Sequence, residues 1–354
     1  CTLTDAEGKE IGRAVSNGEN IAIPVAAPVL WNAEQPYLYT LTLQAGAETI
    51  EQKVGIRTIS VEDGKILING KQVKFRGVKR QDSNPYTGAA VTREDVIRDL
   101  QLMKESNVNA IRTSHYPNAP YFPELCSEYG FYMIAEADLE SHGVGTLYTN
   151  DGHDCMGYIA QDDAWAESIL DRQKRNVIRD KNQSAVIFWS LGNESGYGGN
   201  FEDAGRWVKA YDPTRLLHYE ASICNSAGYH NDVSMLDVMS RMYADTEWVK
   251  EYCEDRRMRK PFIQCEFIHA MGNGPGDIHD YMELMYKYDK FCGGFVWEWC
   301  DHATWEGKAA DGRDIFHYGG DAGEFPHDGN FCMDGLVYPD RRPHTGLLEW
   351  KNEI

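Results

Sequence analysis

The stretch VIFWSLGNESGYGGNF, residues 186–201, decides the fold, because it joins two kinds of element through a polar turn. It begins as an apolar run rich in β-branched and aromatic residues, which is typical of a buried strand. The run stops at Gly192, and Asn193 and Glu194 follow before a glycine-rich turn. The pattern predicts a strand over 185–191, then an amide and a carboxylate, and then a helix.

The same rhythm of strand and helix runs through residues 61–354. Strands are predicted at 73–78, 108–113, 131–136, 185–191, 216–220, 236–240, 261–266 and 293–298. Helices are predicted at 93–105 (with Thr92 as the N-cap), 119–129, 163–181, 200–211, 246–254 and 277–290. Eight strands alternating with helices are typical of an α/β fold, the (β/α)8 TIM barrel. An open doubly wound sheet would need a glycine-rich phosphate turn after its first strand, and RGVKRQDSNP is not one.

Residues 1–60 have a different pattern. Short alternating runs separated by turns, with no helical period, predict antiparallel strands that belong to a β-sandwich. The sequence therefore predicts two domains, with part of a β-sandwich at 1–60 and the TIM barrel at 61–354. The chain starts without methionine in a strand-like run, so we expect a fragment whose natural N-terminus lies upstream.

The composition narrows the possible partners and location. A formal net charge of −20 repels phosphate backbones and anionic lipids, so no nucleic acid and no membrane partner is expected. No apolar run approaches the ~18 residues of a membrane span. Nine cysteines without a C-x-x-C pair favour reduced thiols and a cytoplasmic location.

Polar or aromatic side chains stand at nearly every predicted strand end, where barrels of this kind carry their active sites. They are Lys79, Arg80, Gln81, Asp82, Arg112, His115, Glu140, His142, Asn193, Glu194, Glu220, Tyr243, Glu266, His269, Trp297 and Glu298. Glu194 and Glu266 follow strands that face each other across the mouth. Glycoside hydrolysis uses two such carboxyls, one to protonate the leaving oxygen and one to attack or to activate water. Taken singly, Glu194 also fits a carboxylate favoured by a helix dipole, and Glu266 a surface carboxylate.

Three further groups could contribute to such a site, and two of them also have a structural interpretation. Asn193 could hydrogen-bond a sugar hydroxyl. Arg112 could keep Glu266 ionised as a nucleophile, or form a purely structural ion pair. Glu140 and His142 could join Glu194 around Mg²⁺, but their spacing alone favours ordinary loop hydrogen bonds.

Seven blocks of the sequence, taken together and in order, resemble β-galactosidases of glycoside hydrolase family 2. They are GVKRQDSNP, MKESNVNAIRTSHYPN, LCSEYGFYMIAEADLESHG, VIFWSLGNESGYGGN, CEFIHAMGNGPG, GGFVWEWCD and NFCMDGLVYPDRRPH. The resemblance implies that residues 1–60 end an immunoglobulin-like domain. It also implies a double-displacement, retaining mechanism with Glu194 as general acid/base and Glu266 as nucleophile.

The resemblance implies roles for other residues as well. Tyr243 would contact the nucleophile, and the galactosyl site would contain His115, His269, Asn193 and Trp297, with Trp297 as its apolar floor. Glu140, His142 and Glu194 would hold Mg²⁺. The backbone carbonyl of Phe331 would bind Na⁺.

The sequence departs from the family pattern at three of these positions. Gln81 stands where a sugar-contacting histidine is usual, and it can still donate and accept hydrogen bonds. Asp334 replaces an asparagine that helps to hold Na⁺, which puts sodium dependence in doubt, and Glu298 replaces an aspartate. The family's jelly-roll domain, which completes the sugar pocket, and the domains after the barrel are absent from this stretch, so we expect it to bind substrate poorly.

We therefore predict retaining hydrolysis of terminal β-D-galactosides such as lactose, by a full-length protein that is a homo-oligomer. The two carboxyls should stand ~5–5.5 Å apart, whereas an inverting pair would be wider. A related β-glucuronidase or other β-glycosidase is the first alternative, although the mouth is rich in acids and lacks a late asparagine–lysine pair. A non-catalytic sugar-binding barrel is the second.

Overall fold

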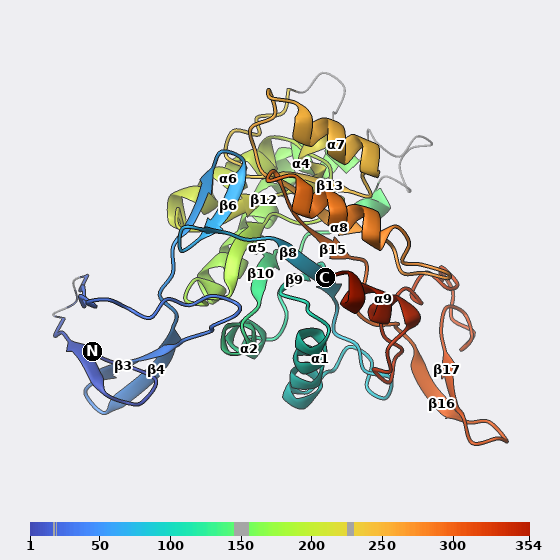
Figure 1. Ribbon diagram of the computed structural model, residues 1–354, viewed down its shortest axis with the longest axis horizontal. Coiled ribbons are helices and arrows are strands. Elements are labelled where there is room, and N and C mark those ends of the chain that lie inside the picture. The colour runs from blue at the N-terminus through green and yellow to red at the C-terminus, as the bar shows by residue number, and fades with distance from the viewer. Residues whose placement is uncertain (17, 19, 145–155, 225–229) are drawn as a thin grey trace.

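A computed structural model describes the chain except for residues 17, 19, 145–155 and 225–229. Its main part is a parallel sheet of eight strands in the order β12-β11-β10-β9-β8-β15-β14-β13. Their bounds are β8 Phe75–Arg80, β9 Ala110–Thr113, β10 Tyr132–Glu136, β11 Val186–Ser190, β12 Leu216–His218, β13 Met239–Met242, β14 Phe262–Phe267 and β15 Phe291–Val296. The sheet curls into a nearly closed barrel (Figure 1), which confirms the predicted fold class.

Two predicted strands differ from the structure. The strand expected over 216–220 ends at His218, because Glu220 starts a short 3₁₀ turn, η2 (Glu220–Ile223). The strand expected over 236–240 begins only at Met239. Before it, Asp237 bonds across to the neighbouring strand, since its Oδ2 accepts Leu217 N at 2.6 Å and its own N–H donates to the Leu217 carbonyl at 3.0 Å.

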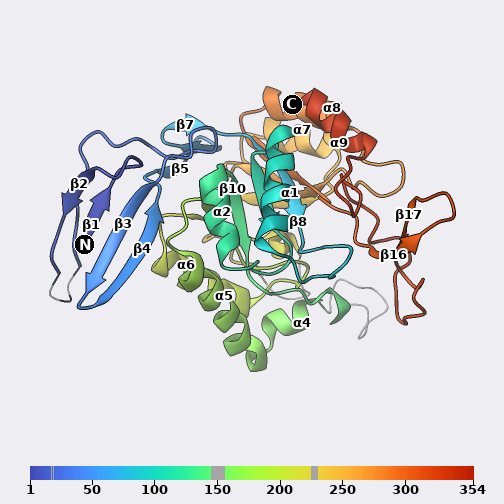
Figure 2. The same cartoon turned by 90° about the horizontal axis from the view of Figure 1, so that it is seen from below.

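Helices cover the outside of the barrel (Figure 2). They are α1 Arg93–Glu105, α2 Tyr121–Tyr129, α4 Met156–Gln161, α5 Ala166–Asp180, α6 Gly199–Tyr211, α7 Thr246–Glu254, α8 Ile278–Lys287 and α9 Thr345–Glu353, with a 3₁₀ turn η1 at Asp163–Trp165. Thr92 caps α1 as predicted, its hydroxyl accepting Asp95 N at 3.2 Å. The helix predicted over 163–181 starts instead as η1, capped by Asp162. α4 and α9 were not predicted.

The barrel interior changes from apolar to polar along its axis. Near the strand starts, Phe75 packs edge-on against Tyr132 and Phe188, with ring centroids 5.6 and 5.3 Å away. Because side chains alternate along a strand, the inward series that begins with Phe75 passes through Gly77 to Lys79. A Cβ on Gly77 would come within 2.2 Å of the Phe295 ring, so only glycine fits there. Charged side chains therefore gather only at the carboxyl ends of the strands.

The N-terminal part forms a four-stranded antiparallel sheet in the order β2-β1-β3-β4, which fits part of an immunoglobulin-like sandwich. Its strands are β1 Thr2–Thr4, β2 Glu10–Arg13, β3 Tyr39–Ala45 and β4 Glu48–Val54. The sheet is joined to the barrel at the end away from the mouth. Trp31 is fully buried and donates to the Ser127 carbonyl on α2, while Arg57 donates to the carbonyls of Ser184 and Val186 at the start of β11.

Two smaller sheets complete the structure. β5 (Ile59–Glu62), β6 (Lys65–Ile68) and β7 (Lys71–Gln72) lie before β8, so the expected domain boundary after residue 60 falls within β5. The hairpin β16 (Thr304–Lys308) and β17 (Asp314–His317) lies on the side opposite the N-terminal sheet (Figures 1 and 2). Among the described residues, no helix has the length and apolar character that a bilayer span requires.

Candidate active site

The turn after β11 places Glu194 beside a second acidic loop. Gly192 has φ +142°, and a Cβ there would come within 2.7 Å of the Leu139 carbonyl oxygen. This close approach lets Asn193 N donate to that carbonyl at 2.9 Å and brings Glu140 alongside Asn193. Glu194 has φ +37°, a backbone strain that is often found at functional positions.

Glu266 ends its strand among three donors. Its Oε1 accepts hydrogen bonds from the Lys79 ammonium and, at 3.2 Å, from Arg112 Nη1. Its Oε2 accepts the Tyr243 hydroxyl at 3.1 Å, and the Tyr243 N–H donates to the Glu266 backbone carbonyl at 2.9 Å. The Arg112–Glu266 ion pair and the Tyr243 contact expected from the sequence are therefore both present.

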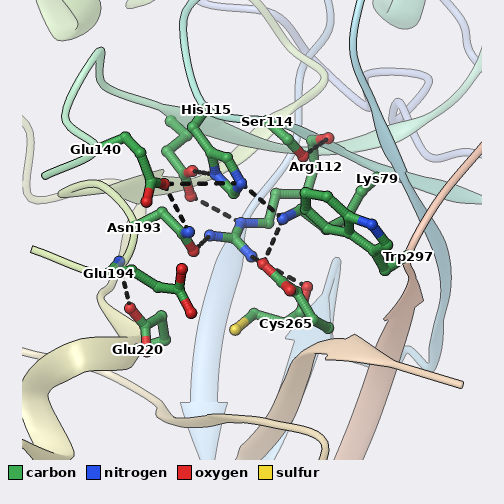
Figure 3. Close-up of polar contacts among 12 residues, drawn as sticks. Lys79, Arg112, Ser114, His115, Glu140, Asn193, Glu194, Glu220, Cys265 and Trp297 are labelled. Atoms are coloured by element: carbon green, nitrogen blue, oxygen red, sulfur yellow. Dashed lines mark hydrogen bonds and ion pairs between the residues drawn. The ribbon is translucent and has the colours of Figure 1, made fainter. Parts of the chain in front are cut away.

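Arg112 links the wall of Glu266 to the wall of Glu194. It is fully buried, and it donates to Glu136 Oε2 at 2.7 Å, to the Cys265 carbonyl at 3.1 Å and to Asn193 Oδ1 at 2.8 Å. Asn193 in turn donates to Glu140 Oε2 at 2.7 Å. Figure 3 shows Glu140, Asn193 and Arg112 linked in this way. Glu266 is thus linked through Arg112 and Asn193 to the turn that carries Glu194.

The charges in this cluster determine the protonation of Glu266 and His115. Burial alone would raise the pKa of Glu266, but the Lys79 and Arg112 charges outweigh it and hold that pKa below its ordinary value. Burial and the Lys79 charge lower the pKa of His115 to about 4. Neutral His115 therefore donates from Nδ1 to Glu136 at 2.6 Å and accepts Lys79 Nζ at Nε2 at 3.0 Å.

Carboxylates surround Glu194 instead. Its backbone N–H donates to Glu220 Oε1 at 2.7 Å, and its Oε2 lies 2.6 Å from His142 Nδ1. Burial raises the pKa of Glu220 to about 8. Burial, with Glu194 adding repulsion, raises the pKa of Glu140 to about 7. Of these two carboxyl groups, Glu220 is therefore the one that keeps its proton near neutral pH.

Glu140, His142 and Glu194 form a group that fits a divalent ion. One ligand atom from each lies within 4.8 Å of those of the other two. Two carboxylates and an imidazole, open enough for water to complete the shell, are a donor set that Mg²⁺ accepts. The structure thus brings together the three residues that the family resemblance implied as metal ligands, although their spacing alone had favoured loop hydrogen bonds.

Aromatic residues form another part of the mouth. The His269 ring lies nearly parallel to the Trp297 ring, with centroids 6.3 Å apart, and Trp297 Nε1 donates to Asp334 Oδ2 at 2.6 Å. Lys79 Nζ covers one side of the Trp297 ring, 3.7 Å from its centroid, so the remaining ring surface is what a sugar could use. Burial and the neighbouring Glu298 carboxylate raise the pKa of Asp334 to about 8. Phe331 is nearby, with its ring 6.4 Å from His269.

The structure also shows where the sequence prediction was incomplete. Gln81 follows β8 and is half-buried, with no hydrogen bond to the described residues, so it is not tied into the cluster. Lys79 and Glu220 had been placed only at strand ends, without a role, although that position is the signal that could have selected them. Glu136 ends an apolar run, FYMIAE, and nothing in the sequence indicates its role. In the structure it is fully buried, and its carboxylate bonds Arg112 and His115.

A parallel β/α barrel with paired carboxylates at the carboxyl ends of its strands defines a hydrolase-type mouth of the kind that glycosidases use. The chain belongs to glycosyl hydrolase family 2. Residues 59–354 match the description "Glycosyl hydrolases family 2, TIM barrel domain", and residues 2–57 match "Glycosyl hydrolases family 2".

Named relatives are similar over nearly the whole chain. A beta-galactosidase of Actinobacillus pleuropneumoniae is 52% identical over 91% of this chain, and one of Staphylococcus xylosus is 46% identical over 99%. The chain spans only 34% and 35% of their respective lengths. A solved β-glucuronidase from Ruminococcus gnavus in complex with uronic isofagomine has a TM-score of 0.75 at 21% identity, covering 99% of this chain and 63% of that one. At that identity the likeness shows the fold alone.

Proposed function

We propose that this chain is the catalytic part of a retaining β-galactosidase. The observation that carries the proposal is the bonded cluster in which a buried, cation-paired Glu266 is joined through Arg112 and Asn193 to the turn that presents Glu194. The named relatives support a β-D-galactoside as the substrate.

Each carboxylate has a distinct role in this proposal. Glu266, ionised, attacks the anomeric carbon while Glu194 protonates the leaving oxygen, and a covalent galactosyl-enzyme forms. Water then attacks with Glu194 as base, and Glu266 departs. Tyr243 orients the attacking carboxylate through its 3.1 Å hydrogen bond.

Other residues bind the sugar and the ions. His115, His269, Asn193, Gln81 and Trp297 line the galactosyl site. Mg²⁺ would be held by Glu140, His142 and Glu194, and when bound it supplies positive charge beside the acid/base carboxylate. Na⁺ would be held by the Phe331 carbonyl and the Asp334 carboxyl group.

A glucuronide is less well matched to this site. Its carboxylate needs a cation that is free to pair with it. The two buried cations of the cluster, Lys79 and Arg112, already pair with Glu266.

The experiment compares chromogenic β-D-galactoside and β-D-glucuronide hydrolysis by the full-length protein and by its Glu266→Gln variant. We expect hydrolysis of the galactoside alone, and none by the variant. Proton NMR of the first product should show the β anomer. An α anomer first, or unchanged activity in the variant, would contradict the mechanism; preferred cleavage of the glucuronide would contradict the substrate.

A further inference from the structure

Lys79 is the residue closest to the proposed nucleophile for which neither the sequence analysis nor the mechanism above gives a role. Its side chain is fully buried at the inward end of β8. Its ammonium contacts Glu266 Oε1, lies 3.0 Å from His115 Nε2 and covers the Trp297 ring at 3.7 Å. Figure 3 shows Lys79 between His115 and Trp297. Three groups of the proposed sugar site therefore meet at one ammonium.

The donors divide the two oxygens of Glu266 unequally. Oε1 faces two cations, Lys79 and Arg112, whereas Oε2 faces only the neutral Tyr243 hydroxyl. Both oxygens accept charge-assisted hydrogen bonds, but only Oε1 also faces full positive charges, whose attraction for the carboxylate a neutral hydroxyl lacks. Oε1 is thus the anchored oxygen, and Oε2 is the one with its lone pairs available to carbon.

We propose that Lys79 is a positioning residue that reserves Oε2 for attack and speeds the release of the sugar from Glu266 in the second half-reaction. This inference rests on the proposed function. Lys79 acts through Glu266 and needs no contact with the substrate.

The charge on Glu266 changes in each of the two steps, and this is why the Lys79 charge favours the second step. In the first step, an Oε2 lone pair forms the bond to the anomeric carbon, and the electrons of the broken glycosidic bond leave with the oxygen that Glu194 protonates. Glu266 becomes a neutral ester, so Oε1 is now a carbonyl oxygen and a weaker partner for two cations. In the second step, water bonds to the carbon and gives its proton to Glu194, and the carbon–Oε2 electrons return to Glu266. The restored carboxylate regains its ion pair with Lys79, which makes it a better leaving group.

The test measures the two half-reactions separately in the full-length protein. A 2-deoxy-2-fluoro-β-D-galactosyl fluoride probe labels the nucleophile in the first step, and reactivation in buffer reports the second. In Lys79→Met, we expect reactivation to slow about tenfold more than labelling, the effect of one pKa unit of lost carboxylate stabilisation. Lys79→Arg, which keeps a positive charge and hydrogen-bond donors near Glu266 Oε1, should hold the ratio within about threefold of the natural protein.

The control is Lys104→Met. Lys104 is a part-buried lysine that donates to the Ala33 and Gly130 carbonyls, outside the site. It should lower the melting temperature and leave the ratio of the two rates unchanged.

Each outcome decides between the two proposals. An unchanged ratio in a folded Lys79→Met protein would overturn the role of Lys79 while leaving the proposed function intact. If that variant does not fold, a tenfold change of the ratio in Lys79→Arg would overturn the role equally. Absence of a covalent label on Glu266 in the natural protein, checked by peptide mass spectrometry, would overturn the proposed function and this inference with it.

Discussion

The two walls of the mouth differ in charge and in burial. On one wall, Glu266 is 5% exposed and is held by Lys79, Arg112 and Tyr243. On the other, Glu194 is only half-buried, and its neighbours include Glu140 and Glu220, whose raised pKa values lie at about 7 and about 8. The cationic wall keeps Glu266 negatively charged, whereas the acidic wall gathers carboxyl groups that burial makes harder to ionise.

The largest effect should come from removing each carboxylate in turn. Glu266→Gln should lower kcat/KM about 10⁴-fold or more for every aryl galactoside, because no group remains to form the covalent bond. Glu194→Gln should lose about 10²–10⁴-fold with poor leaving groups and far less with dinitrophenolate, which needs no protonation. Steady-state kinetics over a leaving-group series checks this difference.

The surface variant Glu105→Gln at the end of α1 controls for the substitution itself. If both site variants lost activity equally across the series, the two walls would not have separate roles.

Arg112→Met should cause the largest loss of stability. It leaves Glu136 and Glu266 buried without their shared cation, and breaking a buried ion pair costs about 3–5 kcal/mol. Urea unfolding of the full-length protein measures this loss. Arg175→Met is the matched control, since its ion pair with Asp171 is exposed and contributes about 1 kcal/mol or less. Equal losses in the two variants would show that the cluster does not stabilise the barrel.

Removing one acid from the opposite wall should weaken metal binding. Glu140→Gln should reduce Mg²⁺ affinity at least about tenfold, because the amide contributes no charge to the ion. Titration calorimetry with MgCl₂ measures this without any substrate. Glu306→Gln, on the hairpin β16–β17, should bind as the natural protein does. Unchanged affinity in Glu140→Gln would exclude Glu140 as a ligand.

The smallest effect concerns acid stability. Burial works to raise the pKa of Glu136, but Arg112 and the bond from His115 outweigh it and hold it far below 4.5. A carboxylate with a lowered folded-state pKa stabilises the fold above its unfolded value and loses that contribution as pH falls. Glu136→Gln should therefore flatten the loss of stability below pH ~4.5, by about 1 kcal/mol per pH unit at most. Parallel pH profiles of urea unfolding would contradict this role.

The sequence allowed the barrel to be predicted because its period is local. Each buried strand and each amphipathic helix carries its own pattern, so every predicted strand overlaps an observed one. The predicted strand bounds are wrong at strand ends, where a side chain can take the place of a backbone hydrogen-bond partner. Asp237 does this before β13, and no periodicity could show it.

The candidate site was predictable only in part for a similar reason. Glu194 and Glu266 stand at strand ends, where position alone makes them candidates. Lys79 also stands at a strand end, but its role depends on its contact with Oε1 of Glu266, which is far away in the chain. Such partnerships depend on which strands are neighbours in space, which a single sequence does not state.

Arg57 follows the N-terminal sheet in the chain, and its contacts with the barrel do more than attach the sheet to it. Its guanidinium donates hydrogen bonds to the carbonyls of Ser184 and Val186, where β11 begins. The other end of this five-residue strand leads directly into Asn193 and Glu194. Because β11 is short and fully buried, these contacts fix where the strand begins and so help to set the position of the turn that carries Asn193 and Glu194. The N-terminal sheet thus supports the candidate site from the opposite end of the barrel.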